Sequence, residues 1–192
     1  MRRAYEMSIR KTILILSLSL AGFACYASEV FWAGAGLGIV QNDIVQFFQL
    51  SNNSWIHDPK MDMTLPAGSN NVFWAGAGLG IVHNNSVQFF QLRNNAWIHD
   101  PMMDMTLPAS SNNVFWAGAG LGIVQNNTIQ IFQLRNNTWI HDPKMDMTLP
   151  AGSNNFFWVS AGLGIVQNNN IQFFQLRNNS LIHDPKMDFY LP

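Results

Sequence analysis

A 42-residue unit repeats along this chain of 192 residues. The second copy, residues 72 to 113, reads VFWAGAGLGIVHNNSVQFFQLRNNAWIHDPMMDMTLPASSNN. The four copies begin at Val30, Val72, Val114 and Phe156. A regular period of this length is typical of repeat architectures, in which each unit packs on its neighbours. The sequence therefore predicts a single repeat domain that spans residues 28 to 192.

Residues 1 to 27 have a different character. A basic start is followed by an apolar run, Thr12 to Phe23, and then by small residues up to Ala27. This order predicts a secretory signal peptide that is cut near Ala27. The apolar run is shorter than the ~20 residues that a transmembrane helix needs. We therefore expect the mature protein to be secreted or periplasmic.

The charge of the mature part limits its partners. Without the leader, the chain has six lysines and arginines against nine aspartates and one glutamate, a net charge of −4. Surfaces that bind nucleic acid are basic, so we expect no nucleic-acid partner. The single cysteine, Cys25, lies in the leader, so the mature chain has no disulfide to stabilise it.

Each repeat has the pattern of several short strands. Aromatic and β-branched residues favour strands at Val72–Gly78, Ser86–Leu92 and Ala96–His99. If the repeat has a fourth strand, it lies at Met103–Leu107. Paired asparagines separate them and are typical of tight hairpin turns, because Asn tolerates positive φ. The third strand stops at Asp100-Pro101, since proline cannot donate to a β-ladder. Three to four antiparallel strands per repeat follow.

The strand Ser86–Leu92 has apolar side chains on both faces. Val87 and Phe89 point to one side, while Phe90 and Leu92 point to the other. Such a strand is buried on both sides, and one small sheet cannot cover both of its own faces. Stacked copies can, and a ring of blades leaves only short edges. We therefore predict an all-β fold of four tandem 42-residue repeats, a small β-propeller.

The two ends of the repeat region are offset. The first copy lacks a preceding MDMTLPAGSNN segment, whereas the last copy ends with the equivalent of that segment, Lys186 to Pro192. If this last strand belongs to the next blade, it completes the first blade and locks the ring. We expect that closure, with an open stack of repeats as the alternative.

The unit resembles a kelch repeat. That family has a strand ending in glycines, a strand with a central aromatic residue, a short turn and then a tryptophan. The corresponding parts here are Val72–Gly78, Gln88–Leu92, Asn94-Asn95 and Trp97, and the resemblance covers residues 28 to 192. It implies a propeller whose ligands bind at its loops, without implying any one activity.

A second architecture also fits part of the pattern. The segment FWAGAGLGIV is similar to strands of small outer-membrane barrels, and two long strands per repeat would give an eight-stranded barrel. Barrel strands alternate apolar and polar residues, and the adjacent pair Phe89-Phe90 interrupts that alternation. The eight-stranded outer-membrane-type barrel is thus the alternative fold.

A histidine followed by an aspartate recurs once in each repeat. In a closed ring, four imidazoles could converge on the axis, where they would suit a transition metal. The favoured interpretation places them at the ends of strands on four separate edges, with the aspartate serving the turn before proline. We predict no metal and no other cofactor, and retain as ligand-binding candidates His57, Asp58, His99, Asp100, His141, Asp142, His183 and Asp184.

Tryptophans form two sets. Indole platforms flanked by Asn, Gln and Asp suit sugars, whose apolar ring faces stack on aromatic groups while their hydroxyls form hydrogen bonds. We expect the set beside the turn to be core: Trp55, Trp97 and Trp139. The other set is the candidate ligand wall: Trp32, Trp74, Trp116 and Trp158.

Binding is the function that this pattern favours. No nucleophile accompanies the His-Asp pair in every copy, since Ala96 replaces the hydroxyl residue found in the others, so we expect no enzyme. Near-identical copies present near-identical sites, and linked weak sites gain avidity. We therefore expect multivalent, lectin-like recognition of carbohydrate or a cell-surface glycan, with oligomers possible. The alternatives are a structural or protein-interaction scaffold and the small outer-membrane barrel.

Overall fold

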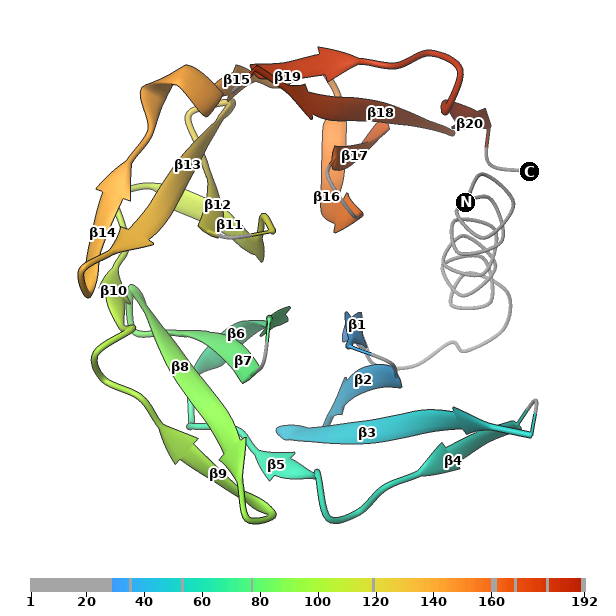
Figure 1. Cartoon of the computed structure of the whole chain (residues 1–192), viewed down its shortest axis with the longest axis vertical. Helices are drawn as coiled ribbons and strands as arrows, with labels where there is room; N and C mark the ends of the chain where they lie inside the picture. The colour runs from blue at the N-terminus through green and yellow to red at the C-terminus, as the bar shows by residue number, and fades with distance from the viewer. Residues whose placement is uncertain are drawn as a thin grey trace.

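A computed structural model describes residues 29 to 190, apart from 35, 53, 77, 119, 160, 161, 168 and 179. The strands form four sheets, one for each repeat, which stand around a common axis as a four-bladed β-propeller (Figure 1). The predicted all-β repeat fold is confirmed. The predicted signal peptide lies outside the described residues. No helix in the described part of the chain is long and apolar enough to cross a membrane.

Each blade contains five strands. The first blade consists of β1 (Glu29–Ala33), β2 (Gly36–Gln41), β3 (Ile44–Ser51), β4 (Ser54–His57) and β5 (Met63–Thr64). The second consists of β6 (Ser69–Ala75), β7 (Gly78–His83), β8 (Ser86–Arg93), β9 (Ala96–His99) and β10 (Met105–Thr106). The third consists of β11 (Ser111–Trp116), β12 (Gly120–Gln125), β13 (Thr128–Arg135), β14 (Thr138–His141) and β15 (Met147–Thr148), with a 3-10 turn, η1, at Pro143–Met145. The fourth consists of β16 (Ser153–Val159), β17 (Gly162–Gln167), β18 (Asn170–Arg177), β19 (Ser180–His183) and β20 (Phe189–Tyr190).

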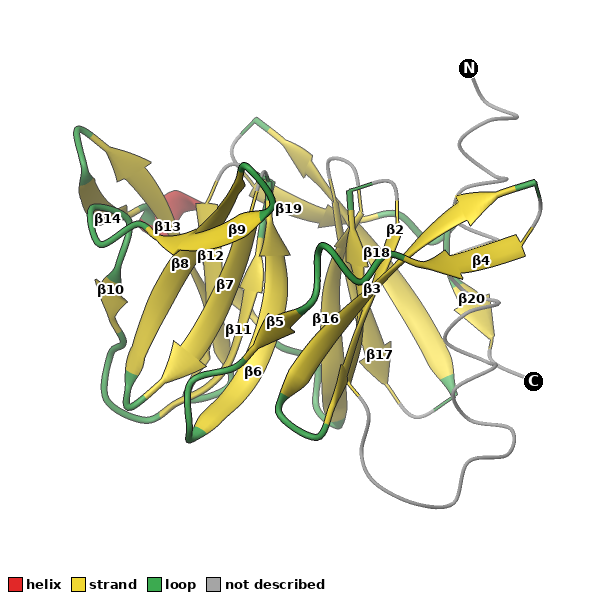
Figure 2. Ribbon diagram, turned by 90° about the horizontal axis from the view of Figure 1, so that it is seen from below, coloured by secondary structure: helices red, strands yellow, loops and turns green. Residues whose placement is uncertain are grey.

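The long third strand of each blade has two partners on its outer edge. In the second blade, β9 pairs antiparallel with residues 90 to 93 of β8, and β10 pairs with residues 86 and 87. The strands β4, β9, β14 and β19 therefore lie at the rim of the propeller, while the first strand of each blade lies near the axis (Figures 1 and 2). The outer edge is in effect one strand interrupted by a five-residue segment.

Asparagine pairs close the hairpins as predicted. Asn84 and Asn85 have φ values of 46° and 62°, and Asn94 and Asn95 have 52° and 60°. Positive φ at both central residues is the type I′ geometry, whose twist matches that of the flanking strands. The repeated asparagines are therefore explained by turn conformation.

The hydrophobic core lies between the blades. On one face of the second blade, Val87 and Phe89 pack with Leu121 and Ile123 of the third blade. On its other face, Leu79 and Ile81 pack with residues of the first blade, among them Phe47. We call these the front face, which meets the following blade, and the back face, which meets the preceding one. The prediction that neighbouring copies cover each other is confirmed.

The last strand does not close the ring by strand exchange. Phe189 of β20 pairs with Ile171 of β18, in the same blade, just as Met105 of β10 pairs with Val87 of β8. The prediction that the final strand completes the first blade is therefore wrong. The physical reason is the short connection: few residues separate the two outer strands, and both run along the same edge.

Pairing also decides between the two predicted architectures. The described strands form four separate five-stranded sheets, and no strand of one sheet pairs with a strand of another. The alternative in which eight long strands close into one sheet is therefore wrong. The third strand packs against a neighbouring blade on each of its faces: Phe89 belongs to the core on one side, and Phe90 packs against the core on the other. This burial of both faces is the feature that requires stacked sheets.

A glycine under an aromatic ring tests the packing inside a blade. A Cβ at Gly80 would clash with the Phe73 ring on the neighbouring strand. We expect Gly80→Ala to lower the free energy of unfolding by about 1–3 kcal/mol, the usual effect of overpacking. Denaturant unfolding measures this. Combining it with Phe73→Leu should restore part of the loss; strictly additive effects of the two substitutions would contradict the proposed clash.

Candidate binding site

The interrupted outer edge is stabilised by one aspartate side chain. In the second blade, the Asp100 N–H donates to the Phe89 carbonyl at 2.7 Å, continuing the ladder from β9. The chain then bulges away, and the Phe89 N–H donates instead to Asp104 Oδ1 at 3.1 Å. A buried backbone N–H needs a partner, and the carboxylate supplies the acceptor that the bulge removes. The same exchange occurs in all four blades.

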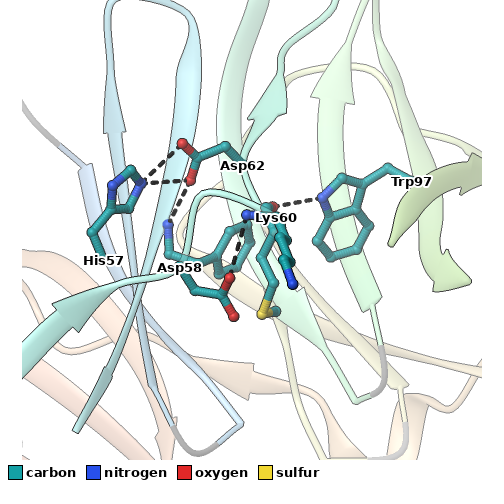
Figure 3. A network of polar contacts seen from close by, with 7 residues as sticks. His57, Asp58, Lys60, Asp62 and Trp97 are labelled. Carbon is teal, nitrogen blue, oxygen red and sulfur yellow. Dashed lines mark hydrogen bonds and ion pairs between the residues drawn. The ribbon is translucent and has the colours of Figure 1, made fainter. Parts of the chain in front are cut away.

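The same aspartate also holds the histidine at the end of the rim strand. His99 Nε2 lies 2.8 Å from Asp104 Oδ2, and its ring packs 5.1 Å from the Phe90 ring. Figure 3 shows the equivalent pair in the first blade, where His57 faces Asp62 at 2.9 Å. The remaining pairs are His141–Asp146 and His183–Asp188.

The partner of each histidine is therefore not the aspartate that follows it directly. That adjacent residue organises the turn: Asp58 Oδ1 accepts the Lys60 N–H at 3.3 Å, and Asp58 Oδ2 accepts from Gln49 Nε2 at 3.2 Å. Sequence reasoning missed the second aspartate, although its recurrence in every copy of the HDPxMD segment was a visible signal. The missed residues are Asp62, Asp104, Asp146 and Asp188.

The four histidines do not meet at the axis. They end β4, β9, β14 and β19, which lie at the rim (Figure 1). The hypothesis of four converging imidazoles is therefore wrong, and the interpretation as strand ends on four separate edges is correct. Within the part of the chain that the structure describes, no group of three or more His, Cys, Asp or Glu residues is placed to hold a metal ion.

A shallow pocket lies beside the interrupted edge of the third blade. Its volume is about 260 Å³, and its lining is mainly polar: Gln133, Arg135, Ile140, His141, Asp142 and Lys144. Arg135 Nη2 donates to Gln133 Oε1 at 2.6 Å, which positions both groups. The pocket thus offers carboxylate acceptors, cationic donors and amide groups around one exposed aliphatic side chain.

The pocket residues recur in the other blades with few changes. In the second blade, Gln91 accepts from Arg93 Nη2 at 2.7 Å and donates to Asp100 Oδ2 at 2.8 Å. The fourth blade has the same arrangement. The first blade has Ser51 in place of the arginine, and the second has Met102 in place of the lysine. Related sets of polar residues therefore occupy the interrupted edge of every blade.

The two tryptophan sets lie together, at the interfaces between blades. The Trp74 ring lies 6.2 Å from Phe47 and 6.4 Å from Trp97, and Trp97 Nε1 donates to the Met61 carbonyl at 2.7 Å. Figure 3 shows this indole reaching the HDPKMD segment of the preceding blade. Trp116 and Trp139 repeat the arrangement one blade later, with Trp139 bonded to the Met103 carbonyl.

Trp158 and Trp32 are the equivalents of Trp74 in the fourth and first blades. Trp158 packs against the core between the third and fourth blades. Trp32 is 45% exposed, and its only tryptophan neighbour among the described residues is Trp55, at 6.3 Å. The structure therefore separates the candidate residues into two groups: tryptophans, which lie at blade interfaces except for Trp32, and His-Asp residues at the rim. It does not bring them together in one site.

Four blades with related edge sites define the protein as a tandem-repeat β-propeller, a fold that supports a binding or scaffold role. No family model and no curated protein matches the sequence. Many solved structures share the fold, and this chain spans somewhat more than half the length of the three described next.

The first is a putative 6-phosphogluconolactonase from Bacteroides fragilis NCTC 9343, 13% identical, matching 86% of this chain and 55% of its own, with a TM-score of 0.51. A putative 6-phosphogluconolactonase from Bacteroides uniformis ATCC 8492 is 12% identical and matches 86% and 56%, with a TM-score of 0.52. A functionally unknown protein from Desulfotomaculum acetoxidans DSM 771 is 11% identical and matches 88% and 58%, with a TM-score of 0.53. At these identities the likeness shows the fold alone.

The two roles of Asp104 can be separated by mutation. Asp104→Ala leaves the Phe89 N–H without its acceptor, so we expect a loss of about 1–3 kcal/mol in the free energy of unfolding. His99→Ala removes the partly exposed contact with Asp104 and the ring contact with Phe90 but leaves the backbone bond in place, so we expect a smaller loss, of about 1 kcal/mol or less. Chemical denaturation compares the two. Equal losses in both variants would mean that the ion pair, and not the backbone bond, stabilises the edge.

Glu29 gives the fold a pH dependence. It replaces the asparagine of the other copies, and its Oε2 accepts the Val72 N–H at 3.3 Å. Burial raises the pKa of Glu29 to about 7, against a smaller lowering by this bond. Because the folded-state pKa is raised, the associated stability is fully present below pH 4.5 and is lost as the pH rises through about 7.

Glu29→Gln should therefore flatten the dependence of stability on pH. We expect thermal unfolding of the parent chain to lose more stability between pH 5 and pH 8 than the variant does, by at most about 3 kcal/mol. Asp43→Asn is the control, because it removes an exposed turn carboxylate and introduces the residue of the other copies. Parallel curves for the parent and Glu29→Gln would show that Glu29 does not titrate in this range.

Proposed function

We propose that this protein is a secreted or periplasmic, multivalent binding protein that recognises carbohydrate at the rim of its propeller. The observation that carries the proposal is the polar pocket at the interrupted edge, lined in the third blade by residues whose types recur in the others. Binding rather than catalysis is the proposed activity. A cell-surface glycan is the proposed partner.

The chemistry of the pocket suits a sugar. Asp142 and Gln133 present acceptors and an amide donor for hydroxyl groups, and the Arg135 and Lys144 side chains add charged donors. The exposed side chain of Ile140 offers an apolar surface of the kind that a sugar ring face covers. The volume of about 260 Å³ is small for a ligand site, so one sugar unit is the appropriate ligand size.

Repetition compensates for a shallow site. A single open pocket excludes little water, so each site binds weakly. Four rim sites on one rigid ring bind a branched or clustered glycan with avidity, because the second contact is effectively intramolecular. This requirement for simultaneous contact favours ligands that are themselves repetitive, such as surface polysaccharides.

Matched charge-neutralising substitutions test the proposal. Replacing the pocket aspartates by asparagine, in Asp58, Asp100, Asp142 and Asp184, keeps the size of each side chain and one acceptor for the turn, and removes the negative charge. We expect the apparent affinity on a glycan array to fall with each replacement. The fourfold variant should fall by at least about tenfold, since a hydrogen bond to a charged group contributes ~1.5–3 kcal/mol.

Asp43→Asn is again the control, because it makes the same chemical change away from the pockets. It should leave glycan binding unchanged. Undiminished binding by the fourfold variant would reject the rim pockets as the sugar site. The tryptophans are unsuitable for this test, because truncating Trp74 or Trp116 also removes packing between blades.

A protein-interaction scaffold is the second candidate function. An exposed isoleucine occupies the same rim-strand position in every blade: Ile56, Ile98, Ile140 and Ile182. A repeated apolar residue on an outer surface suits contacts with protein. Absence of any glycan signal from the folded chain would favour this function over carbohydrate recognition.

A further inference from the structure

Every lysine and arginine that follows the predicted leader lies at the rim of the propeller. The six occupy two positions of the repeat, represented in the third blade by Arg135 and Lys144, which line the shallow pocket together. They are Lys60, Arg93, Arg135, Lys144, Arg177 and Lys186. The same part of the chain has a net charge of −4, so positive charge is confined to the edge sites of an acidic molecule.

A glutamine on the same strand fixes the orientation of the guanidinium. Arg135 Nη2 donates to Gln133 Oε1 at 2.6 Å. In the fourth blade, Nε and Nη2 of Arg177 both donate to Gln175 Oε1, at 3.1 and 2.7 Å. A guanidinium has five N–H donors in a planar fork, so one edge is held and a second edge remains. Among the described residues, Nη1 of either arginine has no acceptor.

Neither cation of the pocket is neutralised by an ion pair. Within the described part of the chain, every ion pair joins a histidine to an aspartate. Asp142, the carboxylate of the pocket, stabilises its turn by accepting the Lys144 backbone N–H at 3.3 Å. Two cationic side chains therefore line the pocket with one carboxylate, and the local excess of charge is positive.

The copies differ in how many of the two cations they keep. The third and fourth blades have both. The first blade has Ser51 in place of the arginine, and the second has the exposed Met102 in place of the lysine. In those two blades a single cation accompanies the turn aspartate, so the charges balance. The excess of positive charge is a property of the third and fourth blades.

We propose that the edge sites of the third and fourth blades prefer an acidic sugar, one whose ring carries a carboxylate. This inference rests on the proposed function and specifies the class of carbohydrate that these two sites bind. The open edge of the guanidinium fits the two oxygens of a planar carboxylate, and the Lys144 ammonium supplies another charged donor. The hydroxyl groups of the same sugar are left for Gln133 and Asp142. The first and second blades lack this preference.

A glycan array that pairs each neutral hexose with its uronic acid tests the proposal. The members of a pair differ only in a carboxylate that replaces a hydroxymethyl group, so the ratio of their affinities isolates the acidic group. We expect the parent chain to bind the uronic acid at least about tenfold more tightly. The ratio should fall as the ionic strength rises, because both cations are exposed.

Substitutions that copy residues of the other blades locate the effect. Arg135→Ser together with Arg177→Ser gives both sites the residue of the first blade and should abolish the preference. Met102→Lys gives the second blade both cations and should raise the affinity for uronic acids at least about threefold, by adding a third site. Asp43→Asn changes the net charge by the same amount as Met102→Lys, but away from the pockets, and should leave the ratio unchanged.

The outcomes separate this inference from the function on which it rests. Equal binding of neutral and acidic sugars would overturn the acidic preference and leave carbohydrate recognition intact. Binding of no sugar by the folded chain would remove both. Equal gains from Met102→Lys and Asp43→Asn would assign the preference to overall charge, and would likewise overturn the assignment to the two pockets.

Discussion

Burial of both faces of each blade is the constraint on which the structure depends. A five-stranded sheet with Val87 and Phe89 on one side and Leu79 and Ile81 on the other cannot be stable in water by itself. Each face is covered only by the opposite kind of face from a neighbouring repeat. The cores therefore lie between repeats rather than within them, and stability accumulates interface by interface.

At the rim, the constraint is the hydrogen bonding of the backbone rather than the burial of apolar side chains. Interrupting the outer strand lets the chain present a loop to the next blade, where the Met61 carbonyl accepts from Trp97. The interruption also removes a backbone acceptor, and the carboxylate of Asp62 replaces it while binding His57. One short segment thus joins two blades, completes the hydrogen bonding of the edge and borders the polar pocket. This coupling explains why HDPxMD varies so little among the copies.

Sequence periodicity was enough to predict the architecture, because apolar residues on both sides of Ser86–Leu92 leave few alternatives to stacked sheets. Paired asparagines predicted the turns, since their tolerance of positive φ is a local property. The path of the last strand and the partner of each histidine could not be predicted in this way. Both depend on which edge a short loop returns to, and that geometry is set by tertiary contacts such as the Phe89 N–H to Asp104 bond.

The near-identity of the repeats has different consequences for the rim and for the interfaces between blades. At the rim, it repeats one set of polar side chains, and under the proposed function this repetition supplies avidity without further contact between blades. At the interfaces, it makes the front face of each blade complementary to the back face of the blade that follows. Between the third and fourth blades, Ile131 stands in the position of Phe89 and Leu181 in the position of Trp97, so a change on one side is accompanied by a change on the other.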